Sequence, residues 1–517
     1  MHTLELYLSP EVAASEDGIK TSAARELRIP VEKISALRFK KRSIDARRSP
    51  IKIRIVLEVY TETAPDAEVP TTYSQLHSSA PSVIIIGCGP AGMFAALRLL
   101  EAGVRPILLE RGKAVRERRR DLAAINKERI VDEDSNYCFG EGGAGTYSDG
   151  KLYTRSGKRG SIDRILKIFT EHGADERIRY EAHPHIGTNK LPGIVSAMSD
   201  TIRQFGGEIH FEERVCDFVL HENEIKEVIT QKGNSYQGEA VILATGHSAR
   251  DIFELLEQKQ IAIEVKPYAL GVRIEHPQSL IDSIQYHCVE RGPYLPPSSY
   301  SLVEQVGGRG VFSFCMCPGG IIAPAATAPG EVVVNGWSPS KRNNPYANSG
   351  MVVALSEKDF IPFQKYGNLA GLEYQRQVEQ RAFLLGGSDL TAPGQRLIDF
   401  LNKKTSTSIP ETSYIPGVKS TPLDEVLPQD IAKALRGGLQ AMGKKMRGYL
   451  SEESVLVGVE SRTSSPVRIP RDRESLLHPQ IVNLYPCGEG AGYAGGIVSA
   501  AIDGERCAEA FLQKTSK

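Results

Sequence analysis

The sequence lacks several features that would assign it to a narrow class. Its 63 basic and 63 acidic residues cancel, so no overall charge attracts the chain to nucleic acid or to an acidic membrane surface. The eight cysteines have no regular spacing and are too sparse in 517 residues for the disulfide framework of a small secreted domain. We therefore expect reduced thiols, a cytoplasmic location and a small-molecule substrate.

Long uninterrupted apolar runs are also absent. The most apolar window, residues 83–100, is broken by Gly87, Gly89, Pro90 and Gly92, which argues against a membrane span. The first residues, MHTLELYLSPE, have neither the basic start nor the apolar stretch of a signal peptide. Both observations favour a soluble protein that does not associate with membranes.

Changes of pattern divide the chain into four segments. Residues 1–78 predict a small βαββ domain that ends in a linker rich in Thr, Ser, Ala and Pro. Residues 79–260 contain the buried strands SVIIIG, RPILLE and AVILATG, residues 261–473 contain more prolines and Gly-rich turns, and residues 474–517 return to strand, Gly-rich turn and helix. The predicted fold class is α/β: a Rossmann-like dinucleotide-binding domain, completed by the last segment, with an inserted α+β substrate domain and a small N-terminal domain.

The N-terminal segment contains a cluster of basic residues. Its members are Arg38, Lys40, Lys41, Arg42, Arg47, Arg48, Lys52 and Arg54. We interpret them as the solvated face of a strand pair, because only Phe39 could stack on a base among these charges. RNA or another polyanion is the alternative partner, and we do not expect it.

Three segments match Gly-x-Gly-x-x-Gly, but only one has the context of a dinucleotide site. Gly87, Gly89 and Gly92 follow an apolar strand and open a helix within a βαβ unit. In that unit Gly87 makes the tight turn, Gly89 admits a diphosphate, and Gly92 allows the helix to pack closely on the strand. The diphosphate would lie on the N-terminus of the helix that begins near Pro90.

A carboxylate stands at the end of the second strand of this unit. Glu110 can accept hydrogen bonds from both ribose hydroxyls of an adenosine, whereas it would repel a 2′-phosphate. We therefore do not expect NADP at this site.

Two later segments identify the dinucleotide through a resemblance. VILATG, residues 241–246, and LYPCGEGAGYAGGIVSAAIDGERCAEAF, near the C-terminus, resemble the two-dinucleotide-binding-domain flavoproteins of the glutathione-reductase superfamily over residues 82–155, 190–250 and 480–515. The resemblance implies FAD, with Val215 meeting the adenine through its backbone and Glu489 holding the ribityl chain. Many members of that superfamily carry Asp where Glu489 stands.

A second resemblance covers nearly the whole chain. NYCFGEGGAGTYSDGKL, ATGHSARDIFELL, FCMCPGG, NGWSPSKRNNPYANSG and GVESRTSSPVRI are similar to segments of poorly characterised bacterial FAD-dependent dehydrogenases that have a small N-terminal α/β domain. It implies FAD and an oxidoreductase class but no substrate.

Glycines recur wherever the chain is expected to pass the flavin. Five glycines between Gly140 and Gly150 permit close backbone approach, and Gly495 and Gly496 open a helix whose amides could face the flavin N1 and C2 carbonyl, where negative charge gathers on reduction. The predicted FAD-binding residues are Gly87, Gly89, Pro90, Ala91, Gly92, Glu110, Arg111, Gly142, Gly143, Ala144, Gly145, Val215, Thr245, Gly246, Gly488, Glu489, Gly496 and Ile497.

Catalytic candidates are fewer. His247, after the ATG turn, is either a proton donor with a pKa near neutrality or a structural histidine. Arg273, Arg342, Arg462 and Arg468 suit a carboxylate or phosphate, although each alone is more often a surface or ion-pair residue. We predict His247, Arg273 and Arg462 as the catalytic set.

Cysteine and histidine pairs add little to this set. Cys315 and Cys317 form CxC, where a redox disulfide would be strained, so a reactive or simply buried thiol is favoured. His183 and His185 lack a second ligand pair at recognisable spacing, and we predict no metal.

These patterns lead to one functional hypothesis and two alternatives. We expect an FAD-dependent oxidoreductase that transfers hydride between the flavin and a small organic substrate. Since only one complete dinucleotide unit is present, either NAD(P)H enters transiently as the electron donor or the electrons arrive from elsewhere. The alternatives are a flavin-dependent RNA-modifying enzyme that uses the basic N-terminal domain and a non-catalytic FAD-binding protein. The oligomeric state is left open.

Overall fold

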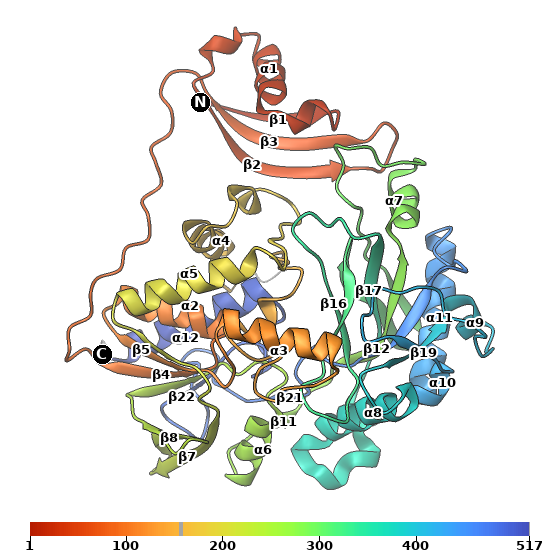
Figure 1. Ribbon diagram of the computed structural model, residues 1–517. Coiled ribbons are helices and arrows are strands. Elements are labelled where there is room, and N and C mark those ends of the chain that lie inside the picture. The colour runs from red at the N-terminus through yellow and green to blue at the C-terminus, as the bar shows by residue number, and fades with distance from the viewer. Residues whose placement is uncertain (155–158, 516–517) are drawn as a thin grey trace.

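The computed structural model describes residues 1–154 and 159–515, which form an N-terminal unit, a parallel-sheet region and a region built on a seven-stranded sheet (Figure 1). The parallel sheet has the order β22-β10-β4-β5-β6. Its strands are β4 (Ser82–Ile86), β5 (Arg105–Leu109), β6 (Glu208–His210), β10 (Ala240–Leu243) and β22 (Leu484–Pro486), and all neighbours are parallel. After the seven-stranded sheet the chain returns to this parallel sheet, where β22 pairs with β10.

Both faces of the parallel sheet are buried, which explains its continuous apolar strands. Val83 and Ile85 pack against α2 (Pro90–Glu101), α4 (Ile162–Glu171), α5 (Leu191–Gln204) and α12 (Ile497–Thr515). Ile84 and Ile86 point the other way, toward α6 (Arg250–Gln258) and the antiparallel strands β7 (Val215–His221), β8 (Glu224–Thr230) and β9 (Ser235–Tyr236). The carboxyl ends of the strands are left to border a cavity.

The seven-stranded sheet supplies the opposite side of the molecule. Its order is β13-β14-β17-β12-β20-β18-β19, antiparallel except for the last pair. The strands are β12 (Ala269–Pro277), β13 (Val303–Val306), β14 (Arg309–Cys317), β17 (Tyr346–Ala354), β18 (Ala392–Arg396), β19 (Val418–Ser420) and β20 (Val455–Glu460). Helices α8 (Ala370–Gly386) and α11 (Gln429–Lys445) share its apolar core, and the hairpin β15 (Ile321–Pro324) and β16 (Val334–Trp337) contacts β12, β14 and β17.

A β-bulge interrupts β14 near the middle of the molecule. Phe314 pairs with Gly350 of β17 and Cys317 pairs with Asn348, so one extra residue lies between these pairs. Within the bulge Cys315 has a φ of 43°, a left-handed conformation that is uncommon for a residue other than glycine.

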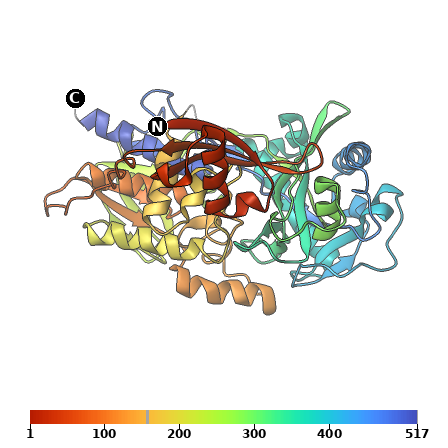
Figure 2. The ribbon, with the colours of Figure 1, turned by 90° about the horizontal axis from the view of Figure 1, so that it is seen from above.

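The N-terminal unit has the predicted βαββ order. Strands β1 (His2–Leu8), β3 (Lys52–Tyr60) and β2 (Ala36–Asp45) form an antiparallel sheet in that spatial order, and α1 (Glu16–Leu27) covers its apolar face. Tyr286 and Leu295 of the seven-stranded-sheet region join the same core, while the Arg42 amide donates to Tyr180 O at 2.7 Å in the parallel-sheet region. The unit therefore spans the junction of the other two regions, as the view from above shows (Figure 2).

No helix among residues 1–154 and 159–515 is long and apolar enough to cross a membrane. The cytoplasmic location and the segment boundaries at residues 78, 260 and 473 stay predictions.

Candidate functional site

A cavity of about 310 Å³ lies between the carboxyl ends of the parallel strands and the seven-stranded sheet. It brings together residues that are hundreds of positions apart in the sequence. Fifteen of the eighteen predicted FAD-binding residues line it: Gly87, Gly89, Pro90, Ala91, Glu110, Arg111, Gly143, Ala144, Gly145, Val215, Thr245, Gly246, Glu489, Gly496 and Ile497. Their direct contact with FAD stays a prediction.

The other three predicted residues shape the walls instead of lining the cavity. A Cβ on Gly92 would lie 2.0 Å from Gly87 O, and a Cβ on Gly142 would lie 2.0 Å from Thr146 Oγ1. Gly488 has a φ of 73° and packs against Ala91. Gly92, Gly142 and Gly488 therefore have a role in close packing, and their direct contact with FAD stays a prediction.

Gly89 and the start of α2 form a cradle that suits a diphosphate. A Cβ built on Gly89 would meet only Gly143 Cα, at 3.8 Å, so the backbone beside the cavity is open. The first helical donor of α2 is the Met93 amide, which donates to Gly89 O at 2.9 Å, and the amides of Ala91 and Gly92 precede it without a helical acceptor. Free amides and the helix dipole favour an anion here.

The Glu110 carboxylate accepts more hydrogen bonds from the protein itself than the sequence predicts. It accepts hydrogen bonds from the amides of Cys88, Gly112 and Gly140, each at 2.9 Å. A carboxylate offers about four acceptor sites, so roughly one remains for a ribose hydroxyl. Glu110 thus joins the first glycine turn to the loop at Gly140 as well as facing the cavity.

Arg118, on α3 (Val115–Lys127), is a functional residue that the sequence reasoning missed. Its side chain is fully buried and donates to the carbonyls of Asn136, Tyr137, Glu141 and Gly143 at 2.8 to 3.1 Å. It holds the glycine loop against the cavity. Its spacing from the apolar residues Val115 and Leu122, at i+3 and i−4, is the signal that could have separated it from the exposed arginines around it.

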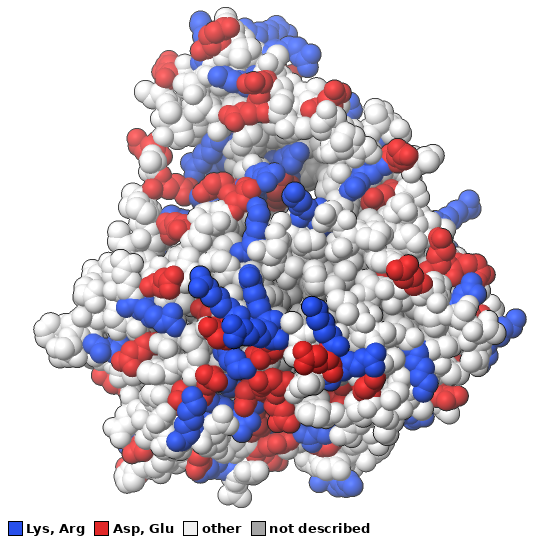
Figure 3. Space-filling model, in the orientation of Figure 1, with Lys and Arg blue, Asp and Glu red and all other residues white. Residues whose placement is uncertain are grey.

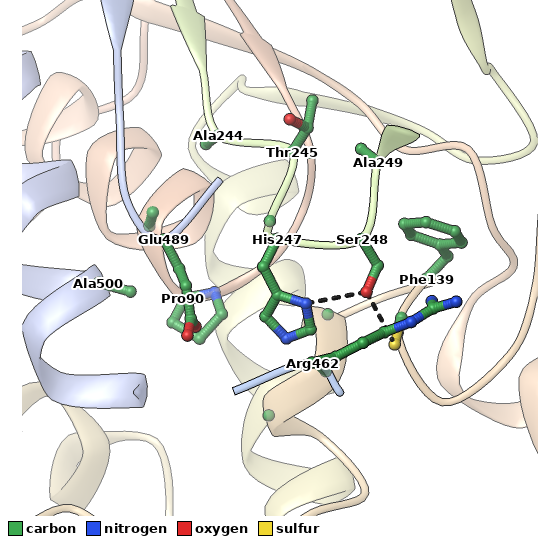
Figure 4. Close-up of a pocket in the computed structure, with 18 of the residues that line it drawn as sticks. Pro90, Phe139, Ala244, Thr245, His247, Ser248, Ala249, Arg462, Glu489 and Ala500 are labelled. Atoms are coloured by element: carbon green, nitrogen blue, oxygen red, sulfur yellow. Dashed lines mark hydrogen bonds between the residues drawn. The ribbon is translucent and has the colours of Figure 1, made fainter. Parts of the chain in front are cut away.

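His247 lines the cavity, and its surroundings determine its ionisation. Nδ1 lies 2.8 Å from Ser248 Oγ, which donates to Cys138 Sγ at 3.5 Å (Figure 4). Burial, together with the nearby Arg462 cation, lowers the pKa of His247 to about 4. The imidazole is therefore neutral at pH 7, which favours the structural alternative, and a catalytic role for His247 stays a prediction.

Arg462 borders the cavity within a buried network of two arginines and two glutamates. Its NH2 donates to Glu331 Oε2 at 2.8 Å and to Glu379 Oε2 at 2.9 Å, and its NH1 donates to Thr327 at 2.6 Å. Arg250 donates to the same two carboxylates. Arg462 consequently has most of its donors engaged, so the structure does not support it as a free anion-binding group.

Arg273 does not line the cavity, which corrects the prediction that it contacts substrate. Its guanidinium is fully buried and binds both oxygens of Glu460, at 2.8 and 2.6 Å. It also donates to Cys315 O at 2.6 Å and to Cys317 Sγ at 3.5 Å. Arg273 therefore supports the cavity wall from behind, on the face of the sheet where it contacts Asn348 of β17 and Glu460 of β20.

The two remaining arginine candidates also have other partners. Arg342 donates to the buried carboxylate of Asp149 at 2.8 and 3.3 Å. Arg468 is half-exposed, lies 4.0 Å from Glu264 and does not contribute to the cavity wall. By contrast Ser148, Asp149 and Lys151, which follow the glycine loop, all line the cavity.

Cys315 and Cys317 face the same cavity from the bulge of β14. The protein around the Cys315 thiol raises its pKa above the usual value, although the residue is exposed, so the thiol is protonated at neutral pH. The structure therefore does not favour a reactive thiolate at Cys315.

Glu489 enters the cavity beside Pro90 and Ala500 (Figure 4). Burial raises its pKa to about 7, although the Gly496 amide and the Lys266 cation oppose that shift. The carboxyl group is thus poised to exchange a proton near neutral pH at the position where the resemblance implies the ribityl chain.

Comparison with protein families agrees with this geometry. Residues 81–132 match the family described as FAD binding domain, residues 267–463 match FAD-dependent protein, C-terminal domain-like, and residues 1–60 match a domain of unknown function, DUF8436. An uncharacterized protein of Clostridium beijerinckii (strain ATCC 51743 / NCIMB 8052) is 38% identical over 516 residues, which cover 96% of each chain.

The chain belongs to the family of this Clostridium protein. FAD is its cofactor, as both FAD-related family matches require and as the open cradle at Gly89 accommodates. Membership of the glutathione-reductase superfamily stays a prediction.

The chain also matches several solved structures at low identity and low TM-score. Glycine oxidase from Bacillus cereus ATCC 14579 is 15% identical with a TM-score of 0.32, covering 84% of this chain and 95% of its own. The tetracycline destructase Tet(51) is 11% identical with a TM-score of 0.34, covering 85% and 83%. CtdE, crystallised with FAD, is 11% identical with a TM-score of 0.30, covering 83% and 82%.

Proposed function

We propose that this protein is an FAD-dependent oxidoreductase whose small organic substrate binds between the flavin and the seven-stranded sheet. The observation that carries this proposal is that one cavity joins the cofactor residues of the parallel-sheet region to Phe314, Cys315 and Asn335 of the sheet region. A ligand in that space would meet groups from both sides, as expected for a site at the carboxyl ends of parallel strands.

The bound flavin supplies the hydride chemistry, and the protein supplies position, proton transfer and electrostatics. The Ala500 amide makes a helical hydrogen bond to Gly496 O, and the amides before it, in the first turn of α12, have no helical acceptor. These amides and the helix dipole favour negative charge in the cavity beside Gly496 and Ile497. Neutral His247 can donate or accept one hydrogen bond at the same site. Glu489 can hold or release a proton near pH 7.

The direction of electron flow defines the subclass, which we propose to be a dehydrogenase or reductase with NAD(P)H as a transient donor. The purified FAD-loaded protein is mixed anaerobically with NADH or NADPH, and the oxidised-flavin band near ~450 nm is followed. Rapid bleaching supports a nicotinamide-driven reductase, whereas bleaching only by an organic substrate supports a dehydrogenase. A flavin that neither class reduces overturns the proposal in favour of a non-catalytic flavoprotein.

The charges of the N-terminal unit argue against the RNA-modifying alternative. Lys and Arg are interspersed with Asp and Glu over this unit (Figure 3). Five of the eight clustered basic residues form ion pairs: Arg38 with Glu68, Lys40 with Glu58, Arg42 with Glu181, Arg47 with Asp45 and Arg54 with Glu5. Paired cations offer little net attraction to a phosphate backbone.

A further inference from the structure

The end of the cavity beneath the seven-stranded sheet has an excess of one positive charge. Two groups of ion pairs lie at this end, and the neighbouring His247 is neutral at pH 7. The five cations of these groups are Arg250, Arg273, Arg342, Arg462 and Lys151, and their four carboxylates are those of Asp149, Glu331, Glu379 and Glu460.

Each arginine at this end has a carboxylate within hydrogen-bond distance, whereas Lys151 shares Asp149 with Arg342. Asp149 is held by Arg342 at 2.8 Å, and its oxygen lies 3.9 Å from Lys151 Nζ, beyond hydrogen-bond distance. Lys151 instead donates to the carbonyl of Met316 and, at 3.7 Å, to Cys317 Sγ. Both acceptors are uncharged, and the single carboxylate of Asp149 faces both Lys151 and Arg342, so one positive charge at the cavity wall is in excess.

The bulge of β14 explains why this ammonium is fixed in place. Between Phe314 and Cys317 the strand leaves its regular pairing with β17, and two carbonyls become available. Cys315 O accepts from Arg273 NH2 at 2.6 Å, and Met316 O accepts from Lys151 Nζ. Arg273 acts as a positioning residue, because it holds the bulge that in turn holds Lys151.

The side chain of Asn335, which contacts Arg273, supplies an amide donor. Asn335, on β16, lines the cavity and accepts from Arg273 NH1 at 3.4 Å and from the Gly336 amide at 2.7 Å through Oδ1. These bonds fix the side-chain oxygen toward the protein and leave the NH2 group for a ligand. One cation and one amide donor match a singly charged carboxylate.

We propose that Lys151 and Asn335 form a carboxylate subsite, so that the substrate of this flavoprotein is a small organic acid. The subsite rests on the proposed function, since it orients the substrate's carboxylate under the sheet and its reacting carbon toward the flavin. The recognising groups come from the segment after the glycine loop and from β16, which places the substrate between the two regions.

The test uses the oxidised FAD-loaded protein and needs no turnover. Benzoate and pyruvate are titrated, each beside its neutral amide, and binding is followed by calorimetry and by the flavin difference spectrum. We expect the acids to bind at least about tenfold more tightly than the amides, since a charged hydrogen bond is lost in the amide. Equal binding of acid and amide, or no binding of either acid, overturns the subsite.

Substitutions of Lys151 and Asn335 distinguish carboxylate binding from an effect of the Lys151 charge on the flavin. Lys151→Met should weaken acid binding about tenfold and leave amide binding unchanged, whereas Lys151→Arg should retain acid binding. Asn335→Asp should weaken acid binding further, and Lys341→Met, an exposed lysine outside the cavity, is the matched control. If Lys151→Met changes the flavin reduction potential but not acid affinity, the charge serves the reduced flavin and the subsite is wrong. Loss of bound FAD in the wild type would instead refute the proposed function.

Discussion

The two ends of the cavity are built in different ways. At the nucleotide end, backbone groups between Gly87 and Gly92 and one carboxylate, Glu110, make the walls, and they lie within a single βαβ unit. At the sheet end, charged side chains far apart in the sequence meet: Asp149 with Arg342, 193 positions away, and Arg273 with Glu460, 187 positions away. The first end depends on steric fit of the main chain, and the second depends on balance among buried charges.

The largest expected effect breaks the steric fit. Gly92→Ala would place a Cβ 2.0 Å from Gly87 O, and a backbone atom cannot move aside as a side chain can. We expect a loss of roughly 3 kcal/mol or more in the free energy of unfolding, together with loss of bound FAD. Denaturant unfolding of the apoprotein and the flavin content after purification measure both effects.

Gly89→Ala is the matched control in the same turn. Its Cβ would meet only Gly143 Cα at 3.8 Å, so the apoprotein should keep its stability within about 0.5 kcal/mol. FAD affinity should still fall by about tenfold or more, because this position admits the diphosphate. If Gly92→Ala and Gly89→Ala lowered the stability of the apoprotein equally, the assignment of a packing role to Gly92 and a diphosphate-binding role to Gly89 would be wrong.

The next effect tests the charge balance of the sheet end. Arg462→Met removes one of the two cations that face Glu331 and Glu379 and leaves a buried carboxylate undercompensated. We expect a loss of about 3–5 kcal/mol in the free energy of unfolding. Adding Glu331→Gln to this variant should recover part of the loss, and a double-mutant cycle measures the coupling. No recovery would mean that packing, and not charge, stabilises the network.

A buried carboxylate that is not hydrogen-bonded to an arginine allows the comparison to be tested by changing the pH. Glu275 on β12 accepts hydrogen bonds from the Ser413 amide and hydroxyl, and burial raises its pKa from 4.5 to about 7. A raised folded-state pKa stabilises the protein below about pH 4.5, and that contribution is lost as pH rises through 7. Glu275→Gln should therefore gain up to roughly 3 kcal/mol relative to the wild type between pH 5 and pH 8.

Denaturant unfolding of both proteins at several pH values measures this difference. The comparison cancels the contributions of Glu489 and Glu505, whose pKa values burial also raises to about 7. A difference between variant and wild type that stays constant from pH 5 to pH 8 would contradict the shifted ionisation of Glu275.

The contrast between the two ends also explains how much the sequence could predict. The glycine spacing and the apolar strands gave the parallel sheet, its C-terminal return and most of the lining residues, because local sterics and hydrophobic pattern determine them. Arg118 and the bulge at Cys315 were missed, since each depends on partners brought in by tertiary packing. The ionisation of His247 could not be predicted for the same reason: its burial and the nearness of Arg462 exist only in the folded chain.

The smallest expected effect concerns Arg468, which the sequence could not distinguish from Arg462. Its side chain is 47% exposed, and its guanidinium lies 4.0 Å from Glu264, so the ion pair is screened by solvent. Arg468→Ala should change the free energy of unfolding by about 0.5 kcal/mol or less and leave FAD affinity unaltered. Flavin fluorescence titration and denaturant unfolding check both expectations. A marked loss of FAD affinity would extend the cofactor site beyond the cavity, because Arg468 lies on β21 (Val467–Arg468), outside its lining residues.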